Sequence, residues 1–480
     1  MNQVSWILPK CLGIAMLDCA RELLGSRRNA SAMHQRLPEI AVRVWEDWGR
    51  RTDERTRIQD LEATARAVGK VRPYVELLVQ DMASEEPESI RLALRRYLSA
   101  VPSAIRRTLR RPEDPKGWTA PPWFVLREPR DVISFLPSQI PMFEPGDRPL
   151  PDVDWELTDL LGAGGFGEVW KAQNPTFQSV PPVVLKFFFD PQAGDRAFRH
   201  EAALLTQAMP KRPHRGLVEL RATYMKHHPP CLEFECVEGG DLITWFRGHR
   251  RQHGPISARL ATRLILRLAR IVGYFHRRNP PIAHRDLKPA NILIRRLGRG
   301  RMELKICDFG IGGLVNAGLN SSVAANGAPN GEEIASRRLI QQTTVKGWYT
   351  PIYASPQQIK GNAPDPRDDV HALGVIWLQL LANDLSLPAP NGAEWPDALN
   401  NHKLSAAQIE LLGLCFHPRA DLRIPNANVM AQEIAARFPN ILTSSPRSHS
   451  AAAATRAKNS ESASKPQDQR GLVNRLKFWT

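Results

Sequence analysis

A glycine-rich segment from Gly162 to Gly167 separates two runs of strand-forming residues, 156–161 and 169–172. Glycines at this spacing let main-chain amides approach phosphate oxygens, where a Cβ atom would block the contact. A dinucleotide-binding unit would continue as a helix directly after the last glycine. Because a strand-like run follows instead, we expect a β-hairpin whose turn covers phosphates. The glycines concerned are Gly162, Gly164, Gly165 and Gly167.

Lys186 stands in the apolar run 183–189, nineteen residues after Gly167. A lysine in such a run is costly unless it meets an anion. Two anions are candidates: nucleotide phosphates under the glycine-rich segment, and Glu201, which lies in a segment of helical periodicity. A lone lysine would more simply reach solvent from an edge strand. The glycine-rich segment upstream favours the anion-binding interpretation.

Two further motifs lie downstream. They are His284-Arg285-Asp286-Leu287-Lys288-Pro289-Ala290-Asn291 and, beginning seventeen residues after Asn291, Asp308-Phe309-Gly310. Together with the glycine-rich segment and Lys186, they resemble the protein-kinase family without a substitution in either motif. The resemblance covers about residues 154–438 and implies an α+β, bilobal fold with a β-rich N-lobe and a helical C-lobe.

The resemblance implies an enzyme that transfers the γ-phosphate of ATP to serine or threonine hydroxyls of protein substrates. Asp286 would accept the hydroxyl proton, and Lys288 would neutralise the γ-phosphate. Thr350, in the run 349–356, would bond both of them. Lys288 and Thr350 are typical of the serine/threonine class, and the chain looks like the bacterial branch of the family. A nucleotide-binding pseudokinase is the alternative, disfavoured because the motif residues are intact.

The resemblance also assigns the cofactor sites. Lys186, aligned by Glu201, would hold the α- and β-phosphates, while Asn291 and Asp308 would bind Mg²⁺, a cation that prefers oxygen ligands. The main chain of 235–237 would bind adenine, and Val184 replaces the small alanine usual in the family. The implied nucleotide-binding residues are Gly162, Gly164, Gly165, Gly167, Val169, Val184, Lys186, Glu235, Val237 and Asp241.

The chain departs from the family pattern at Ser355-Pro356-Gln357, where Ala-Pro-Glu is usual. An amide contact between Gln357 and Arg423 would then replace a buried ion pair. The segment from Asp308 to Gln357 is also long, and we expect an inserted loop. Thr343 and Thr344 are the hypothesised autophosphorylation sites in it.

The rest of the chain is organised around this domain, which we place at 153–440. Residues 1–110 read as helical, with Ile40, Val44 and Trp48 on one face at a spacing of four. This region either binds a regulatory partner or is a packing extension. Ten prolines between residues 112 and 151 predict an extended strap over 111–152 that lies against a neighbouring domain. Residues 441–480 have the composition of a disordered, basic tail.

Charge and cysteine content narrow the function further. The formal net charge of +16 is spread along the chain, and only the tail is basic for its length, so a nucleic-acid partner is not expected. The 6 cysteines show no paired or metal-ligating spacing, which fits a reducing compartment. No stretch reaches the roughly 18 apolar residues of a transmembrane segment. We therefore expect a cytoplasmic protein.

Overall fold

The computed structural model describes residues 7–25, 31–67, 71–111, 113–122, 124–164, 167–189, 214–298, 301–308, 352–387, 395 and 404–441. The chain forms two compact units, 1–437 and 438–480. The described part of the second unit includes a 3₁₀ turn at Pro439–Ile441. All of the fold and the site described below lie in the first unit.

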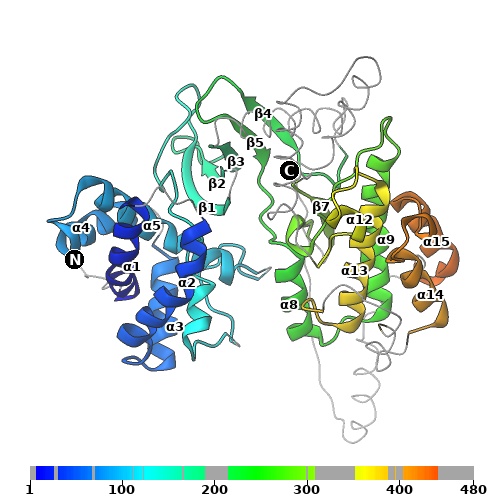
Figure 1. Cartoon of the computed structure of the whole chain (residues 1–480), viewed down its shortest axis with the longest axis horizontal. Coiled ribbons are helices and arrows are strands. Elements are labelled where there is room, and N and C mark those ends of the chain that lie inside the picture. The colour runs from blue at the N-terminus through cyan, green and yellow to red at the C-terminus, as the bar shows by residue number, and fades with distance from the viewer. Residues whose placement is uncertain are drawn as a thin grey trace, which may run out of the picture. The chain divides into compact units, whose positions relative to one another are not determined.

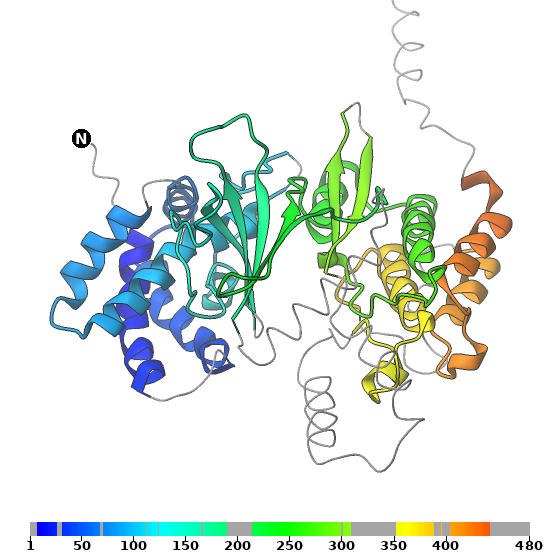
Figure 2. The ribbon, with the colours of Figure 1, turned by 90° about the horizontal axis from the view of Figure 1, so that it is seen from above.

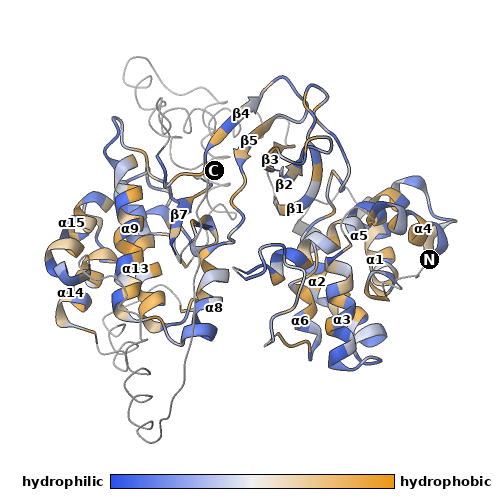
Figure 3. Cartoon of the chain, turned by 180° about the vertical axis from the view of Figure 1, so that it is seen from behind, coloured by the Kyte–Doolittle hydropathy of each residue, from blue (hydrophilic) through white to orange (hydrophobic). Residues whose placement is uncertain are grey.

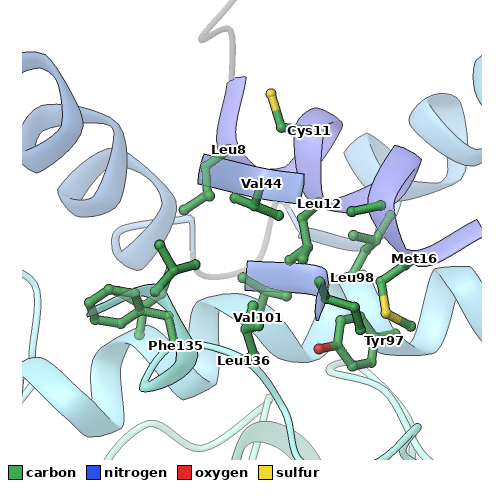
Figure 4. Packing of buried hydrophobic residues seen from close by; sticks show 14 of the residues in the cluster. Leu8, Cys11, Leu12, Met16, Val44, Tyr97, Leu98, Val101, Phe135 and Leu136 are labelled. Carbon is green, nitrogen blue, oxygen red and sulfur yellow. The ribbon is translucent and has the colours of Figure 1, made fainter. Parts of the chain in front are cut away.

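The N-terminal region is helical, as the sequence predicts, and its helices pack around one hydrophobic core. The residues expected on one face are buried: Ile40 is 2% exposed, and Val44 and Trp48 are 0% exposed. Figure 4 shows Val44 in this core, among side chains of α1, α5 and the strap. The helices are α1 (Ile7–Gly25), α2 (Ser31–Val44), α3 (Glu54–Ala65), α4 (Val71–Ala83) and α5 (Glu88–Leu109), with a π-helical turn at Trp45–Gly49 (Figure 1).

The proline-rich strap packs back against these helices. It contains the short helix α6 (Pro129–Ile133), which begins with a proline. Proline has no main-chain N–H, but the first turn of a helix does not use that N–H in a hydrogen bond. Phe135 and Leu136 insert into the helical core. Further along, the buried carboxylate of Glu144 accepts a hydrogen bond from Arg95 of α5 at 3.0 Å. The strap is thus fixed to the helical region by both apolar and charged contacts.

The N-lobe is an antiparallel sheet in the strand order β1-β2-β3-β5-β4. The glycine-rich segment joins β1 to β2, with Gly164 opposite Gly167, so the predicted hairpin is confirmed. A Cβ atom on Gly167 would lie 1.7 Å from the carbonyl oxygen of Phe187, so only glycine allows this approach of β2 to β3. The strands are β1 (Glu156–Gly164), β2 (Gly167–Gln173), β3 (Val183–Phe188), β4 (Leu220–Tyr224) and β5 (Cys231–Glu235).

Helix α5 packs against β1, and Figure 2 shows the N-terminal helices beside the sheet. The contact is charged as well as apolar. Arg106 of α5 is only 3% exposed and forms an ion pair with Asp159 of β1, while Ala100 belongs to the hydrophobic cluster under the sheet. Burial of an arginine is tolerated here because its donors are satisfied.

The C-lobe is mainly helical and is built around α13, which is buried along most of its length. Hydrophobic residues colour much of α9 and α13 in Figure 3. The predicted α+β fold class with a helical N-terminal region is confirmed. No helix in the described ranges is both long and apolar enough to cross a membrane. The elements are α8 (Leu242–His253), α9 (Ala258–His276), β6 (Ile292–Arg296), β7 (Met302–Ile306), α12 (Pro356–Ile359), α13 (Pro366–Ala382), α14 (Ala406–Cys415) and α15 (Ala427–Arg437).

Candidate active site

Three of the predicted catalytic-loop residues share one hydrogen-bond cluster. Lys288 Nζ lies 2.8 Å from Asp286 Oδ2. The side-chain amide of Asn291 donates to the same oxygen at 3.0 Å and to the main-chain oxygen of Asp286 at 2.8 Å. A 3₁₀ turn at Pro289–Asn291 brings the amide back to Asp286. The loop therefore presents a carboxylate that is fixed in orientation and flanked by an ammonium group.

Asp369, at the start of α13, fixes the main chain of this loop by hydrogen bonds. Its carboxylate accepts hydrogen bonds from the main-chain amides of His284 at 2.7 Å and Arg285 at 2.8 Å, and it contacts His276 Nε2 at 2.9 Å. Burial alone would raise the pKa of Asp369, but these hydrogen bonds outweigh burial and lower it. Arg285 has φ of 63°, so the anchor also supports a strained turn directly before Asp286.

Lys186 and Asp308 meet across the two lobes. Lys186 Nζ lies 3.2 Å from Asp308 Oδ1, although the residues are 122 positions apart. Asp308 lies two residues after the end of β7 and has φ of 53°. The ammonium group of Lys186 lowers the pKa of Asp308. The carboxylate is thus kept charged beside a cation.

The residues present fit a magnesium ion. Asn291 is buried, and its amide nitrogen is already engaged by Asp286. The amide oxygen is therefore the atom left to bind a cation. Asp308 supplies a charged carboxylate, so the pair offers the hard oxygen ligands that Mg²⁺ prefers. Held by Asn291 and Asp308, such an ion would neutralise negative charge on the phosphates.

A cavity of about 290 Å³ adjoins these residues and is walled by both lobes. Its lining is largely apolar on the sheet side, where Val169 and Val184 lie, and it includes Lys186 and Asp308. A pocket of this size is at the lower end of small-molecule sites. The predicted residues that line it are Gly162, Val169, Val184, Lys186, Glu235, Val237, Asp241 and Asp308.

The family model for the protein kinase domain matches residues 155–455, more than half of the chain. The chain belongs to the protein kinase family. The structure of the Mycobacterium tuberculosis PknI kinase domain is 18% identical in sequence, covers 62% of this chain and 99% of its own, and gives a TM-score of 0.42.

Curated relatives include bacterial serine/threonine-protein kinases. The protein pkn2 of Myxococcus xanthus is 31% identical over 232 residues, which are 48% of this chain and 24% of pkn2. PknL of Mycobacterium tuberculosis is 27% identical over 238 residues, which are 50% of this chain and 51% of PknL. The chain thus spans at most about half the length of these two relatives.

Some predicted residues of the kinase domain lie outside the described residues. These are Gly165, Glu201, Phe309, Thr350 and the two threonines proposed for autophosphorylation. Gly164 and Gly167 are described but do not line the cavity. The carboxylate of Asp241, assigned to ribose by resemblance, accepts the amide of Thr244 at 2.8 Å as the N-cap of α8.

Glu235, the last residue of β5, belongs to a charge cluster that the sequence did not reveal. The side chain of Glu235 forms ion pairs with Arg295 of β6 and Lys305 of β7. Burial would raise the pKa of Glu235, but the hydrogen bonds from Lys305 and Arg295 prevail and lower it. The alternating pattern of β7 places Lys305 on the polar face with Glu303, so it gave no signal that Lys305 is buried, and its partner depends on strand order.

Two cysteines belong to the wall of the cavity. Cys236 and Cys307 line it, and burial raises the pKa of both thiols.

The departure from the family pattern at Gln357 can be seen in the C-lobe. Arg423 donates to the side-chain oxygen of Gln357 at 2.9 Å. The expected amide contact in place of an ion pair is therefore confirmed.

Proposed function

We propose that the chain is a Mg²⁺- and ATP-dependent serine/threonine protein kinase. The observation that carries this proposal is the arrangement of Asp286, Lys288 and Asn291 in one cluster, beside a cavity that the Lys186–Asp308 ion pair lines. Phosphoryl transfer needs oriented groups and compensated negative charge more than covalent chemistry. This arrangement supplies both.

Each residue has a role in the proposed reaction. The Asp286 carboxylate orients the substrate hydroxyl and takes its proton, and Lys288 stabilises the charge on the transferred phosphoryl group. Lys186 binds phosphate oxygens in competition with its present contact to Asp308. Adenine lies between Val184 and the C-lobe, with the main chain of 235–237 as its hydrogen-bonding edge. The names of the bacterial relatives support the serine/threonine class.

A phosphotransfer assay tests the proposal. The full chain is incubated with MgATP and casein, and phosphate on casein is located by mass spectrometry. We expect phosphoserine or phosphothreonine with the wild type and at least about 100-fold less with Asp286→Asn. Arg91→Ala, on the far end of α5, is the matched control and should transfer at the wild-type rate.

The same assay separates the proposed kinase from a pseudokinase. A pseudokinase binds ADP without transferring phosphate to any acceptor, so nucleotide binding with no product in the wild type would contradict the proposed activity. The intact Lys186–Asp308 pair and the Asn291 amide favour transfer. Loss of transfer with retained ADP binding in Asp286→Asn would place Asp286 in the chemical step.

Autophosphorylation extends the proposal to the long segment between Asp308 and Gln357. Thr343 and Thr344 are the proposed acceptors. Mass spectrometry after incubation with MgATP should find phosphate on at least one of them in the wild type and on neither in Asp286→Asn. Phosphate confined to other residues would contradict this assignment.

A cytoplasmic location is part of the proposal. All 6 cysteines are free in the structure, and ATP and protein acceptors are both present in the cytoplasm. A reducing compartment keeps such thiols from pairing. Fractionation of cells that express the tagged chain tests this, and recovery outside the cytoplasmic fraction would contradict it.

A further inference from the structure

The nucleotide cavity has a wall that the kinase domain does not supply. Arg107 and Arg110, from the end of α5 and the residue after it, and Pro115 of the strap line the same cavity as Lys186 and Asp308. These three residues precede the segment 155–455 that matches the protein kinase family. The N-terminal region therefore takes part in the shape of the site.

The end of α5 is held firmly at this position. Arg106, its last buried arginine, pairs with Asp159 of β1 and donates to the main-chain oxygen of Ala65 at 2.8 Å. The next residue, Arg107, donates to the main-chain oxygen of Leu161 at 3.3 Å. Leu161 directly precedes Gly162, so Arg107 lies where the glycine-rich hairpin begins.

The strap that follows is ordered by its own contacts and reaches the C-lobe. Asp114 accepts hydrogen bonds from the main-chain amides of Trp118 and Thr119, both at 2.8 Å. Gly117 has φ of 67°, and a Cβ atom there would lie 2.2 Å from the main-chain oxygen of Arg106. Glu113 lies 3.4 Å from Arg296 of β6. The segment 110–118 therefore touches elements on both sides of the cavity.

Arg110 has a donor that the described protein does not use. Neither Arg107 nor Arg110 forms an ion pair within 4.0 Å among the described residues. Arg110 Nε is buried and has no hydrogen-bond partner there. An unused buried donor beside a cavity is costly unless a ligand completes it.

The arginines lie toward the sugar end of the cavity rather than the phosphate end. Arg107 contacts Leu161 at the start of the hairpin, and the charge of Arg110 acts on Glu238, which follows the hinge. The Lys186–Asp308 pair marks the phosphate end. Asp241, assigned to ribose by the resemblance, lines the same cavity.

We propose that Arg107 and Arg110 are nucleotide-binding residues that close the sugar side of the site and donate hydrogen bonds to the ribose. This inference rests on the proposed function, because it takes the cavity to be the nucleotide site. It gives the N-terminal helical region a direct part in nucleotide affinity. It also makes the site selective against nucleotides that carry bulk on the ribose oxygens.

Binding measurements on the full chain test the inference. Dissociation constants are determined for MgADP and for an ADP that carries an N-methylanthraniloyl group on its ribose oxygens. The wild type should bind ADP more tightly than the substituted nucleotide. Arg110→Ala and Arg107→Ala should each weaken ADP binding about fivefold, the size of one lost hydrogen bond. Both should narrow the preference for ADP, because the wall is opened.

Controls separate this inference from other failures. Arg91→Ala lies on the same helix, where Arg91 pairs with Glu88, and should keep both wild-type affinities. Arg110→Gln keeps side-chain bulk and serves if Arg110→Ala unfolds, as judged by thermal unfolding without nucleotide. Wild-type binding that both arginine substitutions leave unchanged would overturn the inference alone. Absence of ADP binding by the wild type would instead contradict the proposed function.

Discussion

Lys186 Nζ and Asp308 Oδ1 are 3.2 Å apart, so a central strand of the N-lobe is tied directly to the segment that follows β7. The side chain of Lys186 is 17% exposed and that of Asp308 is 49% exposed. A ligand that enters from the open side therefore reaches the carboxylate more easily than the ammonium group. In the proposed function, Lys186 would exchange this ion pair for contacts to phosphate oxygens.

Replacement of Lys186 by methionine tests that exchange. Lys186→Met should reduce the rate of phosphotransfer by at least about 100-fold, because phosphate charge is left uncompensated. It should also raise the pKa of Asp308, which Lys186 now lowers. Steady-state kinetics with casein measure the first effect. Lys10→Met, which removes an exposed ion pair with Asp81 in the N-terminal helical region, is the control, and an equal loss in both variants would contradict the assigned role.

Two glycines of the hairpin should respond differently to alanine. A Cβ on Gly162 would meet only Val169, at 4.0 Å, whereas one on Gly167 would overlap the main chain of β3. Gly162→Ala should therefore keep wild-type thermal stability and weaken MgADP binding, since its constraint comes from the ligand. Gly167→Ala should unfold at a lower temperature. Equal melting temperatures for the two variants would contradict this division.

The charge cluster of Glu235, Arg295 and Lys305 should be important for stability. Lys305 is 5% exposed and also donates to the main-chain oxygen of Leu217 at 3.1 Å. Lys305→Met leaves the carboxylate of Glu235 buried with one partner fewer, which should lower the free energy of unfolding by about 3 kcal/mol. Urea unfolding measures this. Arg301→Met, at an exposed position beside β7, should change it little, and addition of Glu235→Gln should recover part of the loss.

His371 should make stability depend on pH. It is buried beside Arg423, and burial lowers its pKa from 6.5 to about 4. Between these values the unfolded chain binds the proton and the folded chain does not, so the free energy of unfolding falls as the pH drops from about 6.5 toward 4. The contribution is at most about 3 kcal/mol. Urea unfolding at pH 7.5 and pH 5 should show a smaller difference for His371→Gln than for the wild type, and parallel losses would contradict the assignment.

The sequence predicted the parts of the site that phosphate chemistry constrains. Asp286, Lys288 and Asn291 are close in the chain, and their cluster depends on one short turn. Lys186 and Asp308 are distant in the chain, but each has its own sequence signal. Lys186 is a lysine in an apolar run, and Asp308 begins a motif that resembles the family pattern. The resemblance implied that both residues lie at the phosphates, with Lys186 aligned by Glu201 and Asp308 binding Mg²⁺, but it did not predict the direct ion pair between them.

The parts that depend on tertiary docking could not be predicted. Nothing in the local pattern around Arg107 and Arg110 indicates that α5 ends beside a cavity in a different domain. The partners of Glu235 likewise depend on the pairing of β6 with β7. The helical periodicity around Trp48 correctly predicted burial, although the local turn is π-helical rather than α-helical.

Cys236 and Cys307 both face the cavity, and this has a consequence for reactivity. The thiolate is the form that attacks electrophiles and peroxide, and burial keeps both thiols protonated at neutral pH. Alkylating agents and mild oxidants would therefore modify the cleft slowly, despite the two sulfur atoms in its wall. Burial of the two sulfur atoms therefore limits their reactivity toward such agents.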